Sequence, residues 1–402
     1  MARQGEVVMR GENRTRRSAG CVFVCSATLA FLASLEPSRG SDQAMDNKID
    51  ALFSPLVDVH SPGAAVLAKK DGKITFEKGY GLRDLRSRAK IDPQTNFRLA
   101  SCTKQFTAMA IMLLVQDKRL RYEDRLTDIF HDFPAYGMAI TIRHLLNHTS
   151  GLPDYAELMD REEKTGERRW GPDDQIADEE VLKLLKAEPG GRFAPGTRWE
   201  YSNSGYVVLG LIVAKASGVP YRDFLQERIF SPLKMRQTLV YEKGKNEISR
   251  RAFGHSKENN VLVEGDQSAT SATLGDGGIY SNVADLAKWD EGLRKHTLLS
   301  EKEMQPALTP AKLADGSETH WPPDPHATDP REARPVLYGF GWFLDPYHGR
   351  ARNYHDGGTQ GFRSTIQRFV DDHWTIIVLS NRTDLNPHEL SLKIADIVLA
   401  AK

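Results

Sequence analysis

Strand patterns at both ends of the chain, with helical patterns between them, constrain the fold more than any other feature. Residues 64–68 form an apolar run, Asp71-Gly72 is a hairpin signal, and residues 74–80 have the character of a returning strand. Three further segments near the C-terminus also have strand character: residues 338–343, 364–369 and 374–379. We therefore expect one antiparallel sheet that is built from both chain ends.

The middle of the chain carries helical patterns instead. Six segments have the apolar spacing of helices: residues 104–120, 142–146, 179–187, 206–216, 221–229 and 283–293. A final amphipathic helix over residues 387–401 should pack across the sheet, and one of its faces carries Leu390, Ile394, Ile397 and Val398. These patterns predict an α+β fold in which helices flank the sheet and a mainly helical lobe is inserted in the middle.

The chain is longer than one usual compact domain. Its 402 residues, 40% of them hydrophobic, can bury a large core. We expect residues 41–402 to form one large domain with an insertion, or two closely packed lobes. The sheet lobe would cover about residues 45–98 and 270–402, and the helical lobe about residues 99–269. Two polar stretches, residues 159–180 and 322–335, indicate surface connections of the kind that often border a site.

The first forty residues have the pattern of an export signal. Four arginines precede an apolar run over residues 19–35: Arg10, Arg14, Arg16 and Arg17. Small residues follow, so cleavage is expected near Ser41 and the mature protein would be periplasmic or secreted. The run is short for a membrane span, although an uncleaved N-terminal anchor fits the same pattern. Arg16-Arg17 fits an ordinary basic region better than a twin-arginine signal.

Charge and cysteine content argue against several kinds of partner. Lys plus Arg and Asp plus Glu number 54 each, so no global field attracts nucleic acid or an anionic membrane. After export only Cys102 would remain, which leaves no internal disulfide and no cysteine metal cluster. His144 and His148 lack the glutamate of an H-E-x-x-H site, so we interpret them as helix-surface or capping residues. The expected partner is a small molecule or a short peptide.

Ser-x-x-Lys tetrads mark candidate nucleophiles, and this chain has three of them, beginning at Ser87, Ser101 and Ser231. Ser87 lies in a polar string that is typical of a surface turn, and Ser231 precedes Pro232 at a helix-to-loop junction. Only Ser101 opens a long apolar helix. Lys104 follows nearly one helical turn later, so its amine can reach the Ser101 hydroxyl and act as its base. Burial and the helix N-terminus disfavour a protonated amine, and the same N-terminus directs N–H groups toward an oxyanion.

A second string can supply another proton carrier. Tyr201-Ser202-Asn203 follows a turn and precedes an apolar helix, so Tyr201 and Asn203 can project into one cleft. A phenol beside a lysine can relay the proton to the leaving group, which serine hydrolysis needs when no histidine-aspartate pair is present. A core tyrosine and a capping asparagine are the structural alternative.

A third string, His355-Asp356-Gly357-Gly358, lies just before a predicted strand. Adjacent glycines let a backbone come close to a ligand, so the Gly358 N–H group is a candidate oxyanion donor. A tight Asp-Gly turn is the alternative interpretation.

Together the three strings resemble the penicillin-recognising serine hydrolases, which include class C β-lactamases, D,D-peptidases, D-aminopeptidases and serine esterases. The resemblance extends over about residues 44–401. Four supporting strings lie at residues 97–100, 142–152, 275–281 and 338–342. It implies a β-lactamase/transpeptidase-like fold and hydrolysis through an acyl-enzyme, without a metal or an organic cofactor.

The resemblance also implies a role for each matching residue. Ser101 would be acylated, and Lys104 and Tyr201 would share the proton transfers. Asn203 would bind the substrate amide or hold Lys104. The backbone N–H groups of Ser101 and Gly358 would form the oxyanion hole.

His355 departs from the family pattern. It stands where β-lactamases and D,D-peptidases carry the lysine of a Lys-Thr-Gly triad, and Asp356 replaces the hydroxyl residue, while Gly357 matches. All three would contact the substrate. A largely neutral imidazole beside an aspartate is a poor receptor for the carboxylate of a β-lactam. Arg363 would restore a positive charge if it faced the site.

The sequence therefore predicts a serine hydrolase that acts on an ester, an amide or a D-amino-acid peptide. One alternative is a true class C β-lactamase or a D,D-carboxypeptidase. Another is a non-catalytic homologue that binds cell-wall peptide, which the intact Ser101, Lys104 and Tyr201 argue against.

Overall fold

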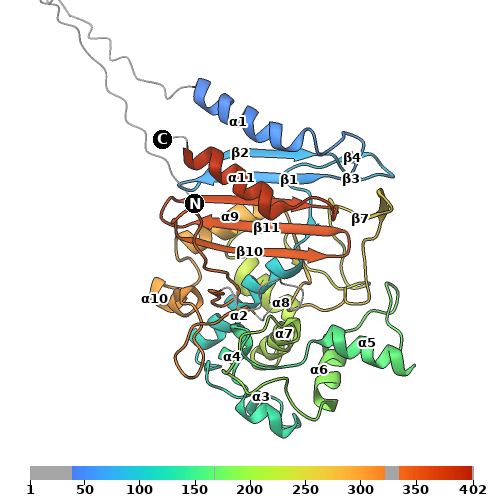
Figure 1. The fold of residues 1–402 in the computed structure, drawn as a ribbon, viewed down its shortest axis with the longest axis vertical. Coiled ribbons are helices and arrows are strands. Elements are labelled where there is room, and N and C mark those ends of the chain that lie inside the picture. The colour runs from blue at the N-terminus through green and yellow to red at the C-terminus, as the bar shows by residue number, and fades with distance from the viewer. Residues whose placement is uncertain (1–38, 167, 322–334, 401–402) are drawn as a thin grey trace, which may run out of the picture. The chain divides into compact units, whose positions relative to one another are not determined.

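The central element of the fold is a five-stranded antiparallel sheet in the order β10-β11-β12-β1-β2 (Figure 1). The computed structural model describes residues 39–166, 168–321 and 335–400, so the expected export signal lies outside the described residues and stays a prediction. The strands are β1 (Ala64–Lys70), β2 (Lys73–Tyr80), β10 (Arg352–Thr359), β11 (Phe362–Phe369) and β12 (Trp374–Ser380). Strands from the two chain ends meet where β1 pairs with β12, which confirms the predicted sheet.

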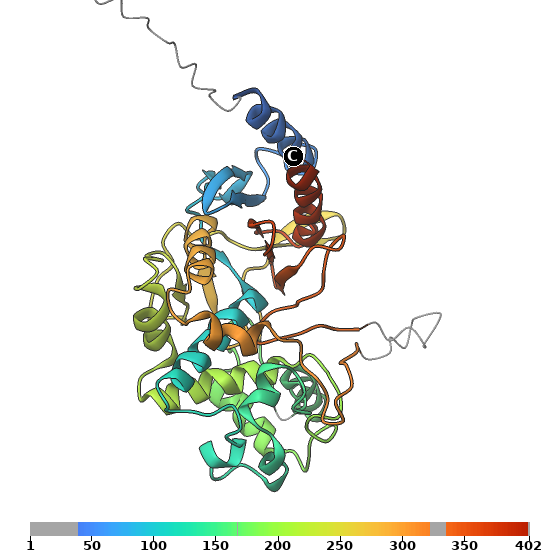
Figure 2. The same cartoon turned by 90° about the vertical axis from the view of Figure 1, so that its left-hand side faces the viewer.

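Both faces of this sheet are covered, because consecutive residues of a strand point to opposite sides. On one face Val66 packs with residues of α1 (Arg39–Phe53) and α11 (Pro387–Ala400). On the other face Leu67 joins the main core, and α9 (Val283–Arg294) lies on that side (Figures 1 and 2). Burial on both faces explains why β1 is apolar from Ala64 to Ala68 without alternation.

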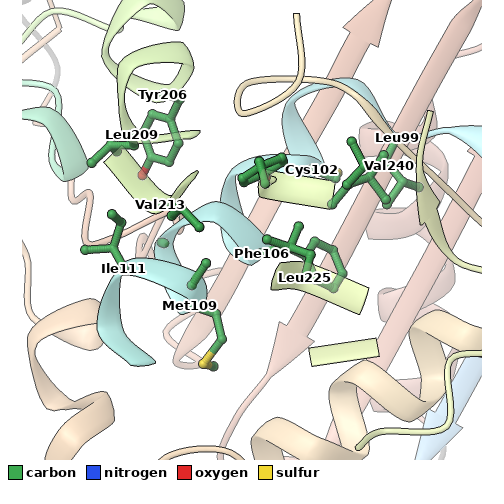
Figure 3. Packing of buried hydrophobic residues seen from close by; sticks show 14 of the residues in the cluster. Leu99, Cys102, Phe106, Met109, Ile111, Tyr206, Leu209, Val213, Leu225 and Val240 are labelled. Atoms are coloured by element: carbon green, nitrogen blue, oxygen red, sulfur yellow. The ribbon is translucent and has the colours of Figure 1, made fainter. Parts of the chain in front are cut away.

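The helical block lies between the first two and the last three strands in the sequence. At its centre are α2 (Lys104–Gln116) and α7 (Asn203–Ser217), which contact each other and contribute Ile111 and Val213 to the same buried core (Figure 3). The shorter helices of this block are α3 (Leu126–Ile129), α4 (Ile142–Leu146), α5 (Tyr155–Thr165), α6 (Asp178–Ala187) and α8 (Tyr221–Leu225). The predicted helices are confirmed, with small shifts at their ends.

Short elements connect these layers. The single helical turns are η1 (Ala100–Thr103), η2 (Ala135–Ala139), η3 (Gln226–Phe230), α10 (Glu301–Met304) and η4 (Gln305–Leu308). Among the small strands, β3 (Leu82–Asp84) pairs with β4 (Ala89–Lys90), and β7 (His255–Glu258) pairs with β8 (Val261–Glu264). Strand β9 (Ile279–Ser281) pairs with β5 (Phe97–Arg98) on one side and with β6 (Leu239–Val240) on the other. Strand β5 leads directly into η1. The division into a sheet lobe and a helical lobe stays a prediction.

Three local predictions are corrected by the structure. Residues 338–343 form no strand, because Gly341 has a φ of 75° and turns the chain so that Tyr338 and Phe343 make one isolated bridge. The string at residues 355–358 lies inside β10 rather than before a strand. The polar stretch at residues 159–180 is partly helical, because α5 extends to Thr165 and buries Met159. Of the other polar stretch, residues 322–334 lie outside the described residues.

Among the described residues, no single helix is long and apolar enough to cross a membrane. One pair of helices that is bent by 80°, Asn203–Ser217 with Tyr221–Phe230, meets the criteria of length and composition.

Candidate active site

Ser101 lies in the helical turn η1, which leads directly into α2. Ala100 has a φ of 48°, a conformation that costs an alanine free energy and turns the chain sharply just before Ser101. Ser101 is partly exposed, whereas Lys104 is completely buried. The Nζ atom of Lys104 lies 3.1 Å from the Oγ atom of Ser101, so the predicted contact between these side chains is confirmed.

Two further oxygens fix the Lys104 amine. Its Nζ atom donates to Oδ1 of Asn203 at 2.9 Å and to the backbone carbonyl of Asp276 at 3.2 Å. The ring centroids of Tyr201 and Tyr206 lie 4.9 and 5.5 Å from Nζ. Within the part of the chain that the structure describes, no carboxylate forms an ion pair with this amine. Lys104 is therefore held by neutral groups beside the candidate nucleophile.

The Asn203 side chain can accept a hydrogen bond from Lys104 because another residue caps α7. The Oγ atom of Ser202 accepts a hydrogen bond from the Gly205 N–H group at the start of this helix. The interpretation of Asn203 as the helix cap is therefore wrong. The sequence could place both side chains at this helix start, but it could not show which of them caps it.

His148 is a residue near the site that the sequence did not indicate. It is fully buried behind Tyr201, and the two ring centroids are 4.4 Å apart. Its Nδ1 atom accepts from the Ser202 N–H group at 3.1 Å, and burial, with the nearby Lys104 charge, holds its pKa well below its usual value. The expected surface or capping position is thus wrong for His148, which lies beyond α4 at a φ of 63°. His144 does contact the capping residue of α4.

The candidate nucleophile Ser101 lines a cavity of about 270 Å³. Four of the predicted site residues contribute to its wall: Ser101, Tyr201, Asn203 and Gly358. No sequence pattern predicted a role for the other lining residues, which are Arg98, Ala100, Tyr155, Thr270, Thr273, Asp276, Gly277 and Thr359. Arg98 and Asp276 belong to strings that carried the family resemblance, and this was the only signal for them.

A close backbone contact places strand β10 beside the nucleophile. A Cβ atom on Gly357 would overlap the carbonyl oxygen of Leu99, so this position admits only glycine. The Ser364 hydroxyl donates to the same Leu99 carbonyl at 2.7 Å and ties β11 to the segment before Ser101. Gly357 therefore packs against the backbone and does not line the cavity, whereas Gly358 does, as the oxyanion prediction requires.

His355 is buried and does not line the cavity. Its Nδ1 atom donates to the carbonyl of Asp356 at 2.6 Å, which leaves Nε2 to accept from the Tyr338 hydroxyl at 3.1 Å. Burial, together with the Lys104 charge, lowers the pKa of His355 to about 4. The imidazole is neutral near pH 7, as expected. Because His355 does not line the cavity, its position does not support the predicted contact with substrate.

Asp356 faces the opposite side of the sheet. Its carboxylate accepts from the Thr365 hydroxyl at 2.6 Å and pairs with Nδ1 of His388, on α11, at 2.8 Å. Like His355, it does not line the cavity. Asp356 is next to His355 in a strand, so the two side chains point apart.

Arg363 contacts the β10–β11 turn. Its Nη1 atom donates to the carbonyls of Thr359 and Phe362 at 2.8 and 2.7 Å, and burial lowers its pKa. It does not line the cavity, so it does not supply the missing lysine charge there.

The buried imidazole of His355 predicts a pH dependence of stability. Its pKa is about 4 in the folded state and near 6.5 when unfolded, so the unfolded chain binds more protons between these values. Its contribution to stability is complete above the unfolded pKa and is lost as the pH falls toward 4. The His355→Gln variant should therefore lose about 2 kcal/mol less free energy of unfolding than the wild type between about pH 7 and 4.5.

Urea unfolding at these two pH values measures the difference. The exposed His60 provides a matched control, and His60→Gln should follow the wild-type curve. Equal pH dependence of the His355 variant and the wild type would contradict the assignment.

A known protein family matches most of this chain. The Beta-lactamase family model matches residues 49–401. Penicillin-binding protein 4* of Bacillus subtilis (strain 168) is 32% identical over 366 residues, which cover 87% of this chain and 75% of that protein.

Solved structures share the fold. The octameric penicillin-binding protein homologue from Pyrococcus abyssi superposes with a TM-score of 0.70 at 25% identity, covering 90% of this chain and 77% of the other. The D-amino acid amidase from Ochrobactrum anthropi SV3 gives a TM-score of 0.72 at 23% identity, covering 89% and 100%. The predicted β-lactamase/transpeptidase-like fold is confirmed. This chain belongs to the beta-lactamase family of serine hydrolases.

Proposed function

We propose that this enzyme hydrolyses an ester, an amide or a D-amino-acid peptide through an acyl-enzyme on Ser101. The observation that carries the proposal is the 3.1 Å contact between Nζ of Lys104 and Oγ of Ser101. This contact lies at a cavity that Tyr201, Asn203 and Gly358 also line. The same intact contact argues against a non-catalytic peptide binder.

Each residue has a chemical step in this proposal. As the general base, the Lys104 amine takes the proton of Ser101 while Oγ forms a bond to the substrate carbonyl carbon. The backbone N–H groups of Ser101 and Gly358 stabilise the oxyanion. Tyr201 relays a proton to the leaving group as its bond to carbon breaks. Water then attacks the acyl-enzyme, and the released products are an acid and free Ser101.

The charge distribution favours these substrates over β-lactams. At the position of the family's triad lysine the chain has His355, which is neutral and does not line the cavity. Arg98 lines the cavity, but its guanidinium donates to the carbonyls of Ser271 and Gly277. A β-lactam carboxylate therefore lacks the charged receptor that the family pattern provides. The likeness in fold to a D-amino acid amidase, by its name an enzyme for amides, is compatible with this choice.

Parallel rates on three substrates test the proposal. An aryl ester with a short acyl chain and a D-Ala-D-Ala peptide should each be compared with a chromogenic cephalosporin. We expect kcat/KM for the ester to exceed that for the cephalosporin by about 30-fold or more, the order of effect of a missing charged partner. A cephalosporin that is hydrolysed faster than the ester would favour a true β-lactamase, and dominance of the peptide would favour a D,D-carboxypeptidase.

A further inference from the structure

Asp276, which lines the cavity, has a carboxylate oxygen with no hydrogen-bond partner among the described residues. Asp276 lines the cavity and is only 7% exposed. Its Oδ2 atom accepts a hydrogen bond from the Tyr155 hydroxyl at 3.1 Å. Its Oδ1 atom is buried and unpartnered in the part of the chain that the structure describes. Such an atom costs free energy unless a ligand satisfies it, because buried polar groups are normally hydrogen-bonded.

Two basic residues that bond to the backbone of the loop around Asp276 have partners other than its carboxylate. Lys104 donates to the backbone carbonyl of Asp276 and forms no ion pair with its carboxylate. Arg98 donates to the carbonyls of Ser271 and Gly277, and so holds the loop that carries Asp276. Within the described ranges no basic side chain forms an ion pair with this carboxylate. The Asp276 carboxylate is therefore left without an ion-pair partner in the described part of the protein.

The neighbours of Asp276 are suited to a donor with several protons. The Tyr155 hydroxyl also contacts the Thr273 hydroxyl at 3.3 Å, and both residues line the cavity. Burial, together with the Asp276 charge, holds the pKa of Tyr155 well above its usual value, so the phenol stays protonated. An ammonium group has three donors and no acceptor, and it could bond to Oδ1 and to an adjacent hydroxyl at once.

We propose that Asp276 binds a protonated primary amine of the substrate. The proposal rests on the proposed function and specifies its substrate class: aminoacyl amides, esters or short peptides with a free amino group near the scissile bond. The cavity volume of about 270 Å³ is at the small end of ligand pockets, which favours a single aminoacyl group over a long peptide.

Two anilides that differ only in the amine test this assignment. Alanyl p-nitroanilide, as each enantiomer, carries an ammonium group where propionyl p-nitroanilide carries a hydrogen. For the wild type we expect at least one alanyl enantiomer to exceed the propionyl compound in kcat/KM by about 30-fold or more. Asp276→Asn should bring this ratio close to one. The ratio cancels any effect of the substitution that is common to both substrates.

The exposed Asp315 supplies a matched control, and Asp315→Asn should keep the wild-type ratio. Equal wild-type rates on the two anilides, with hydrolysis of an aryl ester intact, would overturn the role of Asp276 and leave the proposed function standing. An unchanged ratio in Asp276→Asn, with both rates lowered, would also overturn it and indicate an effect through Lys104. If neither anilide nor the aryl ester were hydrolysed, the proposed function would fail as well. The wild-type comparison needs no variant, so it remains decisive even if Asp276→Asn does not fold.

Discussion

Ser101→Ala is expected to abolish hydrolysis of an aryl ester, with a fall in kcat/KM of about 10⁴-fold or more. The reason is that the acyl-enzyme requires the Oγ atom, and among the residues that the structure describes the Lys104 amine bonds to no other hydroxyl. The side chain is partly exposed, so its truncation leaves no buried cavity and the fold should be retained. Initial rates and a thermal melt of the same preparation measure both effects.

The two other Ser-x-x-Lys tetrads provide matched controls for this variant. Ser87 is exposed and donates to Asp84, and Ser231 is exposed and accepts from Gln226. Ser87→Ala and Ser231→Ala should therefore keep the wild-type rate. Loss of activity in either control, or its retention in Ser101→Ala, would show that the nucleophile has been misassigned.

Lys104→Met is expected to lower kcat by about 10³-fold, within the range for loss of a general base. Methionine has a similar length and would fill the completely buried site, but it cannot accept the Ser101 proton. The substitution should lower the free energy of unfolding by about 1–3 kcal/mol, because Oδ1 of Asn203 loses its hydrogen-bond donor. Rates at saturating ester, with urea unfolding of the same variant, separate the loss of chemistry from the loss of stability.

A second variant distinguishes a base from a positive charge. Lys104→Arg keeps a cation at this position, but a guanidinium is always protonated and cannot take up the Ser101 proton. It should be as inactive as Lys104→Met. Substantial activity in a folded Lys104→Arg protein would mean that Lys104 acts through its charge and that another group removes the proton.

The parts of the fold that the sequence predicted are those in which local pattern and burial agree. Strands β1 and β12 are buried on both faces and each contains an unbroken apolar run, over residues 64–68 and 376–379, so their residues identify them. The contact between Ser101 and Lys104 could also be predicted, because it depends only on three residues of helical spacing.

Strand β10 was missed for a physical reason. Its sequence contains charged residues and a glycine pair, because Gly357 must fit against the Leu99 carbonyl and Asp356 pairs with His388. Without the strand, the sequence could not show that His355 and Asp356 point to opposite faces. A one-residue uncertainty in strand register reverses the direction of every side chain.

The newly identified part of the cavity depends on tertiary contacts alone. Tyr155 begins α5, whereas Thr273 and Asp276 belong to the loop that precedes β9. Arg98 and Lys104 bond to backbone carbonyls of that loop and help to hold it beside α5. No periodicity or spacing in the sequence reports such an encounter, and a lone aspartate beside glycines suggests only a turn.

The central claim is that Ser101 is the residue that becomes acylated, and covalent labelling tests it most directly. A fluorophosphonate probe reacts with activated serine nucleophiles, and peptide mapping by mass spectrometry locates the adduct. The account predicts one adduct on the peptide that contains Ser101, and none on Ser101→Ala or, because the serine is no longer activated, on Lys104→Met. An adduct on another residue of the active wild-type enzyme would contradict it.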